Sequence, residues 1–186
     1  MMFNNKDFIF YRRASYSQEA CDYAIRFFEK RIDLQEVGTH GNRFDPHEKK
    51  CSEMVLKRKE YTFFEDMLQG CIREYVKKYP SVQLMERWDL APRFKIQRYH
   101  PGEGYFVEHC ENCGAEGDIK RMLAWMVYLN DVTDGGYTKF PKQNRKFQPR
   151  RGDVLMWPAY FTHPHCGVTS KTQTKYIATG WCSFKE

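Results

Sequence analysis

Two histidines and one carboxylate in the second half of the chain have the residue types and spacing of a metal site. His109 and Glu111 are separated by one residue, and His165 follows 54 residues after Glu111. Two histidines and a carboxylate can occupy one face of a ferrous ion and leave its other coordination positions open. Lys175, ten residues beyond His165, can hold a carboxylate of a co-substrate. Together these residues predict non-haem iron oxygenase chemistry.

Other interpretations of these residues stay open at the level of the sequence. A histidine exposed at the surface, with no ligand role, is the commoner outcome for a short motif. His163 lies two residues before His165 and could face the same way, so it is an alternative distal ligand. His109, Cys110 and Cys113 could also belong to a zinc site. A structural zinc site needs four ligands, usually with a second paired cluster, and the remaining cysteines are isolated.

The first half of the chain predicts helices that would support such a site. Ser15 is placed to cap a helix, with Gln18 completing a capping box. Apolar residues then follow helical spacing over residues 20–28. A second helical stretch is predicted from about residue 49 to residue 79, and Pro80 ends it.

From about residue 88 the pattern changes to strands. Residues 93–99 alternate between apolar and polar, and 122–129 form a continuous apolar run typical of a strand buried on both faces. Further strands are expected at 154–157 and 175–184. Short strands separated by turns indicate a sandwich or barrel. We therefore predict one α+β domain, with residues 1–87 as a mainly helical support and 88–186 as the β core.

Composition narrows the class of protein. A chain of 186 residues is long enough to bury a core without disulfides. The longest apolar run, 122–129, is too short to cross a bilayer, and the first residues show no signal peptide. Seven scattered cysteines then favour a reducing compartment, and we expect a cytoplasmic protein. The net charge is +6, but the 30 lysines and arginines are interleaved with 24 acidic residues. We therefore expect neither a nucleic-acid partner nor a membrane partner.

Three segments carry a resemblance to a known family. Residues 121–141 resemble the central signature of prolyl 4-hydroxylase-like 2-oxoglutarate/Fe(II) dioxygenases, where a Tyr-Leu-Asn strand end leads into Gly-Gly-x-Thr-x-Phe-Pro. Residues 97–105 look like the strand and turn before that family's first metal ligand, and 175–181 look like its last core strand. The resemblance covers about residues 88–186. It implies a double-stranded β-helix, or jelly roll, buttressed by N-terminal helices.

The resemblance also implies roles for individual residues. Three would be the catalytic iron ligands: His109, Glu111 and His165. Four would bind 2-oxoglutarate or line its pocket: Tyr99, Lys175, Thr179 and Trp181. Most prolyl 4-hydroxylases have aspartate where this chain has Glu111, which keeps the charge and ligand chemistry on a side chain one methylene longer.

The implied activity is hydroxylation of an unactivated C–H bond, with a peptidyl proline as the expected substrate. Fe(II), 2-oxoglutarate and molecular oxygen would take part, with ascorbate as a further reductant. Two alternatives remain. One is a related oxygenase acting on a free amino acid or other small molecule, and the other is an inactive jelly roll that only binds a ligand. The sequence predicts no oligomeric state.

Overall fold

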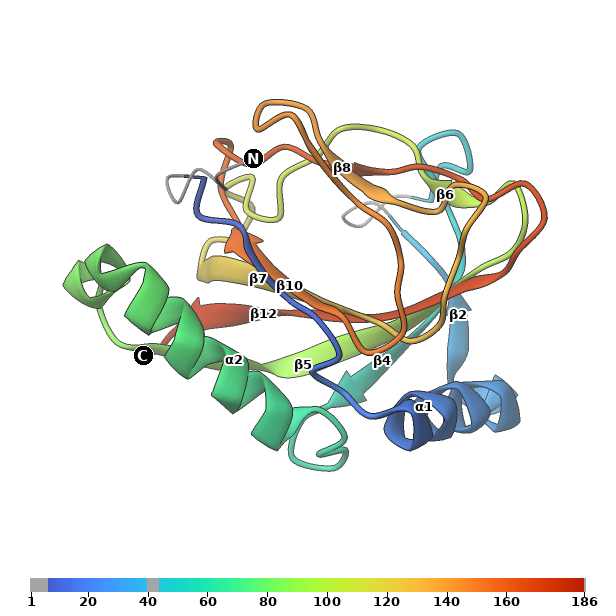
Figure 1. Cartoon of the computed structure of the whole chain (residues 1–186), viewed down its shortest axis with the longest axis horizontal. Coiled ribbons are helices and arrows are strands. Elements are labelled where there is room, and N and C mark those ends of the chain that lie inside the picture. The colour runs from blue at the N-terminus through green and yellow to red at the C-terminus, as the bar shows by residue number, and fades with distance from the viewer. Residues whose placement is uncertain (1–6, 40–43, 186) are drawn as a thin grey trace.

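A large twisted antiparallel sheet faces smaller sheets across the interior, and two helices cover its outer side (Figure 1). The computed structural model describes residues 7–39 and 44–185. The helices are α1 (Gln18–Lys30) and α2 (Glu65–Lys78), with the short 3₁₀ helices η1 (Ile32–Leu34) and η2 (Pro80–Leu84). The strands are β1 (Phe10–Arg12), β2 (Gln35–Val37), β3 (Lys49–Lys50), β4 (Ser52–Lys57), β5 (Trp88–Tyr99), β6 (Gly104–Tyr105), β7 (Arg121–Tyr128), β8 (Thr138–Phe140), β9 (Arg145–Phe147), β10 (Val154–Pro158), β11 (Cys166–Gly167) and β12 (Lys175–Phe184).

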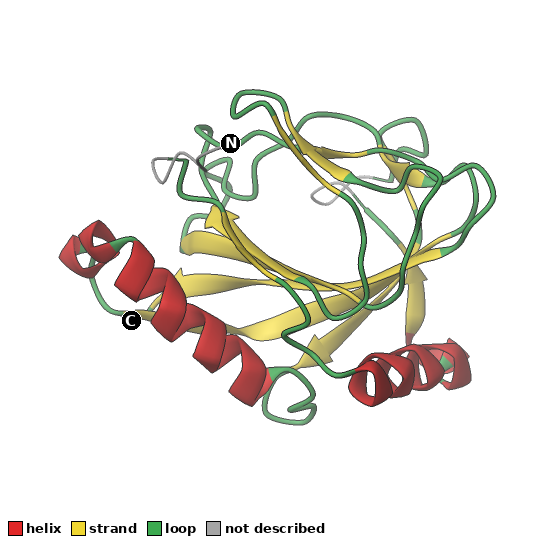
Figure 2. Cartoon of the chain, viewed as in Figure 1, coloured by secondary structure: helices red, strands yellow, loops and turns green. Residues whose placement is uncertain are grey.

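The strand order shows how distant segments meet. The large sheet runs β1-β10-β7-β12-β5-β4-β2, and the smaller sheets run β11-β8-β9 and β3-β6. The last strand, β12, therefore lies between β5 and β7, and its pairing with both is antiparallel. Figure 2 shows that both helices lie on one side of this sheet and the short strands on the other. Two antiparallel sheets facing each other are the arrangement predicted for a jelly roll.

The two faces of β5 explain this layering. Phe94 and Ile96 are buried in an apolar cluster that also contains side chains of α1 and α2. Lys95, Gln97 and Tyr99 alternate with them and line a cavity on the opposite side. Burial of the apolar row against the helices fixes the register of the strand, because a shift by one residue would bury the charged row.

The predicted beginning of the first helix is wrong by two residues. The N-cap of α1 is Ser17, whose side chain accepts a hydrogen bond from the Ala20 amide at 3.2 Å. The Ser15 amide instead donates to the carbonyl of Gly152 at 2.8 Å. This contact with the turn before β10 holds Ser15 outside the helix, so its side chain cannot cap it.

The predicted second helix is wrong over residues 49–57. That segment forms β3 and β4, and helix α2 begins only at Glu65. Met54 and Leu56 alternate with Glu53 and pair along β5, so a period of two overrides the helical pattern. The large sheet thus takes strands from the first 87 residues, and the division at residue 88 stays a prediction. Among the described residues, no helix has the length and apolar composition needed to cross a membrane.

Candidate active site

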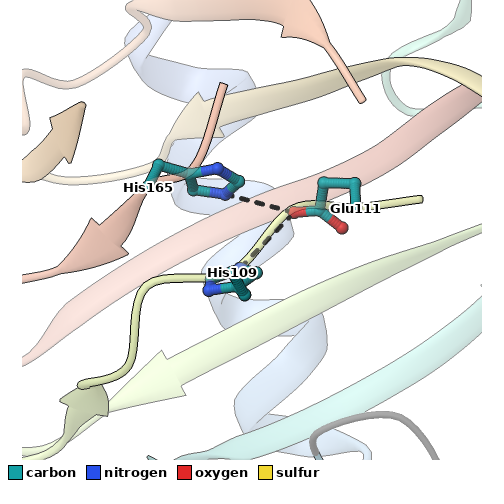
Figure 3. Close-up of side chains that lie close together, drawn as sticks. All are labelled: His109, Glu111 and His165. Atoms are coloured by element: carbon teal, nitrogen blue, oxygen red, sulfur yellow. Dashed lines mark ion pairs between the residues drawn. The ribbon is translucent and has the colours of Figure 1, made fainter. Parts of the chain in front are cut away.

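His109, Glu111 and His165 meet at one point inside the structure (Figure 3). Their ligand atoms all lie within 4.8 Å of one another. Oε1 of Glu111 is 3.8 Å from Nε2 of His109 and 3.3 Å from Nε2 of His165. A backbone bridge brings the two histidines together, since each amide donates to the other's carbonyl at 3.0 Å. The chain therefore aligns two segments that lie far apart in the sequence.

Both imidazole rings are oriented by backbone carbonyls. Nδ1 of His109 lies 3.1 Å from the Val107 carbonyl, and Nδ1 of His165 lies 3.1 Å from the His163 carbonyl. Each Nδ1–H donates to its carbonyl, which leaves Nε2 with a lone pair aimed at the meeting point. Two such lone pairs and a carboxylate oxygen are a donor set that suits a divalent transition metal such as Fe(II).

The protonation states also suit a metal. Burial, reinforced by the neighbouring His165, lowers the pKa of His109. Burial alone would raise the pKa of Glu111, but its contacts with the two histidine rings outweigh it and hold the pKa well below its usual value. A neutral imidazole and an ionised carboxylate are the forms that bind metal ions.

Aromatic rings fix the two histidines from the sides. The ring of Tyr105 stacks on His109 with centroids 3.5 Å apart. Phe140 stacks on His165 at 5.2 Å, and Trp157 meets the same ring edge-on at 4.9 Å. These contacts restrict ring rotation and keep water from most of the imidazole surface.

Glu111 is held at both ends by residues of the large sheet. Nε1 of Trp181 donates to Oε2 of Glu111 at 2.9 Å, which leaves Oε1 facing the histidines. Nη1 of Arg121 donates to the Glu111 carbonyl at 2.9 Å. The Arg121 guanidinium also lies 3.8 Å from the centroid of the Trp181 ring and pairs with Asp118 at 2.8 Å. The sequence pointed to Trp181 but gave no signal for Arg121.

A cavity of about 340 Å³ opens from the three residues toward Lys175. Lys175 is 5% exposed, and its Nζ donates to the Gly136 carbonyl at 3.0 Å. Burial lowers its pKa to about 8. In the described part of the chain no acidic side chain pairs with this ammonium group. A buried cation without an acidic partner is costly, so the site suits the far carboxylate of a dicarboxylic ligand such as 2-oxoglutarate.

The other predicted co-substrate residues also line this cavity, with different hydrogen bonds. The Tyr99 hydroxyl donates to Oε1 of Gln97 at 2.9 Å, and its ring centroid lies 4.7 Å from Nζ of Lys175. Oγ1 of Thr179 donates to the Trp125 carbonyl at 2.8 Å. Tyr99 therefore contacts the lysine through its ring, and its predicted hydroxyl contact with 2-oxoglutarate stays a prediction.

The alternative ligands lie elsewhere or bind other groups. Both ring nitrogens of His163 are occupied, by the Asp7 carbonyl at 2.7 Å and the Thr162 hydroxyl at 2.9 Å. The thiol of Cys110 donates to the Asn112 carbonyl, and that of Cys113 to Asp118. Across residues 7–39 and 44–185, the histidine–glutamate–histidine set is the one group with three or more metal-ligating side chains.

A buried ion cluster beside the cavity was missed from the sequence. Glu53 on β4 is 3% exposed and accepts hydrogen bonds from Lys49 at 2.8 Å, Lys95 at 2.6 Å and Gln97 at 2.9 Å. Burial would raise the pKa of Glu53, but the two lysines outweigh it and lower the pKa. The sequence did not reveal this cluster because Lys95 and Gln97 reach Glu53 through the pairing of β4 with β5, and the β4 segment was predicted as helix.

Comparison with known proteins agrees with this fold and site. A family model described as the 2OG-Fe(II) oxygenase superfamily matches residues 94–183. Residues 94–183 are therefore similar to a 2-oxoglutarate/Fe(II) oxygenase core, and the three candidate metal ligands lie within this matched segment. Fe(II), 2-oxoglutarate and oxygen are confirmed as the cofactor set of this superfamily.

Two curated relatives carry prolyl 4-hydroxylase names. A protein of Acanthamoeba polyphaga mimivirus is 31% identical over 111 residues, covering 50% of this chain and 46% of the relative. A prolyl 4-hydroxylase 9 of Arabidopsis thaliana is 29% identical over 116 residues, covering 47% and 39%. The chain thus matches less than half the length of each of these relatives.

Solved structures confirm the double-stranded β-helix fold. The viral collagen prolyl hydroxylase of Paramecium bursaria Chlorella virus-1, solved with 2-oxoglutarate, gives a TM-score of 0.74 at 20% identity, covering 97% of this chain and 98% of that one. A Trichoplax adhaerens prolyl hydroxylase, solved with a hypoxia inducible factor peptide, gives 0.76 at 14% identity, covering 96% and 84%. At these identities the likeness establishes the fold alone.

Proposed function

We propose that the protein is a 2-oxoglutarate- and Fe(II)-dependent dioxygenase that hydroxylates a peptidyl proline. One observation carries the proposal: a three-donor metal site and a buried lysine without an acidic partner share one cavity. A cavity of about 340 Å³ has room for a five-carbon dicarboxylate beside the metal site. The names of the relatives support proline as the target.

Each residue would have a distinct role. His109, Glu111 and His165 would hold the iron, and the remaining coordination positions would stay open. When bound, the iron together with 2-oxoglutarate and oxygen supplies the oxidising chemistry, which yields succinate, carbon dioxide and a hydroxylated C–H bond.

The rest of the cavity would orient and shield the co-substrate. The Lys175 ammonium would bind the far carboxylate as a point charge. Tyr99 and Thr179 would form the walls of the pocket, and Trp181 would keep Glu111 in its binding rotamer. The stacked rings around the histidines would exclude water from the reacting centre.

An anaerobic titration tests the site before any substrate is known. Fe(II) and 2-oxoglutarate should give a visible charge-transfer band when both bind at one metal. We expect His165→Ala to abolish the band and Lys175→Ala to require much more 2-oxoglutarate. His100→Ala, at an exposed turn residue, is the matched control. A folded wild-type protein without the band would favour an inactive ligand-binding jelly roll.

Mass spectrometry of proline peptides and free amino acids, with and without ascorbate, tests the substrate. A gain of one oxygen atom on a peptidyl proline would support the proposal. Turnover of a free amino acid and of no peptide would instead favour the small-molecule oxygenase.

We also propose a cytoplasmic location and a peptide or protein as the partner. All seven cysteines are free, which supports a reducing compartment. A Trichoplax relative solved with a peptide supports the choice of partner. Cell fractionation with an antibody, together with a count of reactive thiols in the purified protein, tests the location.

A further inference from the structure

A basic groove leads away from the candidate active site along the inner face of the large sheet. Its volume is about 770 Å³, and it shares Thr39, Lys95, Arg121 and Trp181 with the metal-site cavity. A ligand in this groove could therefore extend to the candidate metal site without leaving the protein surface.

The charges lining this groove leave a small positive surplus. Two of its charged side chains are acids, Glu36 and Glu53, and five are cations, two of which pair with acids at the edge, Arg121 with Asp118 and Lys185 with Asp89. The cations are Arg93, Lys95, Lys120, Arg121 and Lys185. A surplus of one sign of charge in a cleft attracts ligands of the opposite sign and raises their association rates.

The ion cluster of Lys49, Glu53 and Lys95 lies where the groove meets the cavity, and it contributes to the positive charge of both. Lys49 and Lys95 share one carboxylate, that of Glu53, so the three groups carry a net positive charge. Lys95 is partly exposed, and both lysines line the metal-site cavity. An anionic group entering from the groove would meet this surplus charge near the candidate metal site.

Arg93 adds a cation at the outer part of the groove. It lies two residues before Lys95 on β5, so both side chains project from the same face of the strand. Arg93 is exposed and forms no ion pair with an acidic residue of the described chain. Next to it the groove offers an apolar surface at Val55, which is 42% exposed, and at Pro92.

We propose that this groove binds an extended peptide with acidic residues beside the target proline. The inference rests on the proposed function and specifies its substrate class. The apolar surface suits proline or aliphatic side chains, while Arg93 and the Lys49–Glu53–Lys95 cluster suit carboxylates. Such rim charges chiefly govern association rate and specificity.

Paired peptides test the inference. One peptide of each pair carries Asp or Glu on one side of proline, and the other carries Asn or Gln at the same positions. We expect a higher kcat/KM for the acidic member and a steep loss of that advantage as salt is raised. Arg93→Glu should lower kcat/KM for the acidic peptide by roughly threefold to tenfold and leave the amide peptide little changed. Lys95→Met should reduce the same preference.

Arg73→Glu is the matched control, because it makes the same charge change at an exposed position on α2, outside the groove. Equal turnover of acidic and amide peptides, or equal losses in the two arginine variants, would overturn the inference. A single-stranded RNA that binds more tightly than the acidic peptide, and loses binding in Arg93→Glu, would also overturn it.

The failure of the proposed function would look different. In that case no peptide would be hydroxylated, although the anaerobic charge-transfer band could still report a loaded site. Fluorescence anisotropy of a labelled acidic peptide would then test the groove without turnover. Binding that depends on Arg93 would support the groove, and an absence of binding would refute it.

Discussion

Replacing Trp181 with phenylalanine should weaken metal binding through a residue that does not touch the metal. The change removes the hydrogen bond from Nε1 to Oε2 of Glu111, which is 2.9 Å long, and keeps a ring for Arg121 to cover. A hydrogen bond to a charged group contributes about 1.5–3 kcal/mol. Loss of such a partner of a metal ligand typically lowers metal affinity about 10- to 100-fold. We expect a loss of that size for Trp181→Phe.

Calorimetric titration of the metal-free protein with Fe(II) under nitrogen, or with Co(II) as an air-stable probe, measures the effect. Trp88→Phe is the matched control, because Trp88 lies at the start of β5 and packs against the apolar core. Thermal unfolding of both variants separates metal affinity from stability. An unchanged dissociation constant for Trp181→Phe, or an equal loss in Trp88→Phe, would refute the reasoning.

Three further outcomes follow from the same structure. Lys175→Met should weaken 2-oxoglutarate binding at least roughly 30-fold, because the buried carboxylate of 2-oxoglutarate would lose its cation. Fe(II) affinity should be retained, and calorimetry checks both. Burial lowers the pKa of Lys175 to about 8, so the side chain is charged below that pH and neutral above it. The affinity for 2-oxoglutarate should therefore fall as the pH rises past 8, and Lys175→Met should abolish this dependence. Gly180→Ala should lower the free energy of unfolding in urea by about 1–3 kcal/mol, because the added Cβ would lie 2.6 Å from the Trp125 ring, whereas Gly117→Ala meets no atom within 4 Å and should cost less.

Sequence patterns identified those parts of the site whose geometry follows from strand alternation. Residues 175–181 alternate on the last strand, so Lys175 and Thr179 were predicted to share a face, and both line the cavity. His109 and Glu111 are also two residues apart and their side chains meet, but they lie at an isolated bridge and a bend and not on the predicted strand. The N-terminal part was harder because β3 and β4 are only two and six residues long. Pairing with β5 determines their structure, and such long-range pairing leaves little local signal.

Arg121 shows why some positioning residues escape sequence analysis. Its guanidinium reaches Glu111 because the chain between them folds back on itself. Within that segment, Asn112 donates to the carbonyls of Ile119 and Arg121, and Asp118 pairs with the guanidinium. None of these contacts follows from the period of a helix or strand. The same turn holds the backbone of Glu111 in place. The Glu111 side chain, one methylene longer than the aspartate of most prolyl 4-hydroxylases, therefore extends from a fixed backbone position.

The charges of the cavity indicate that metal and co-substrate bind as a coupled pair. The three metal ligands carry one negative charge, and Lys175 adds one buried positive charge. Fe(II) brings two positive charges and 2-oxoglutarate two negative ones, so these contributions sum to zero when both or neither are bound, and to a charge of two when only one is bound. Either one alone leaves a charge of two among these groups, which is costly in a low-dielectric site. The site should therefore favour the joint complex over either partial complex, and it is this complex that the charge-transfer band reports.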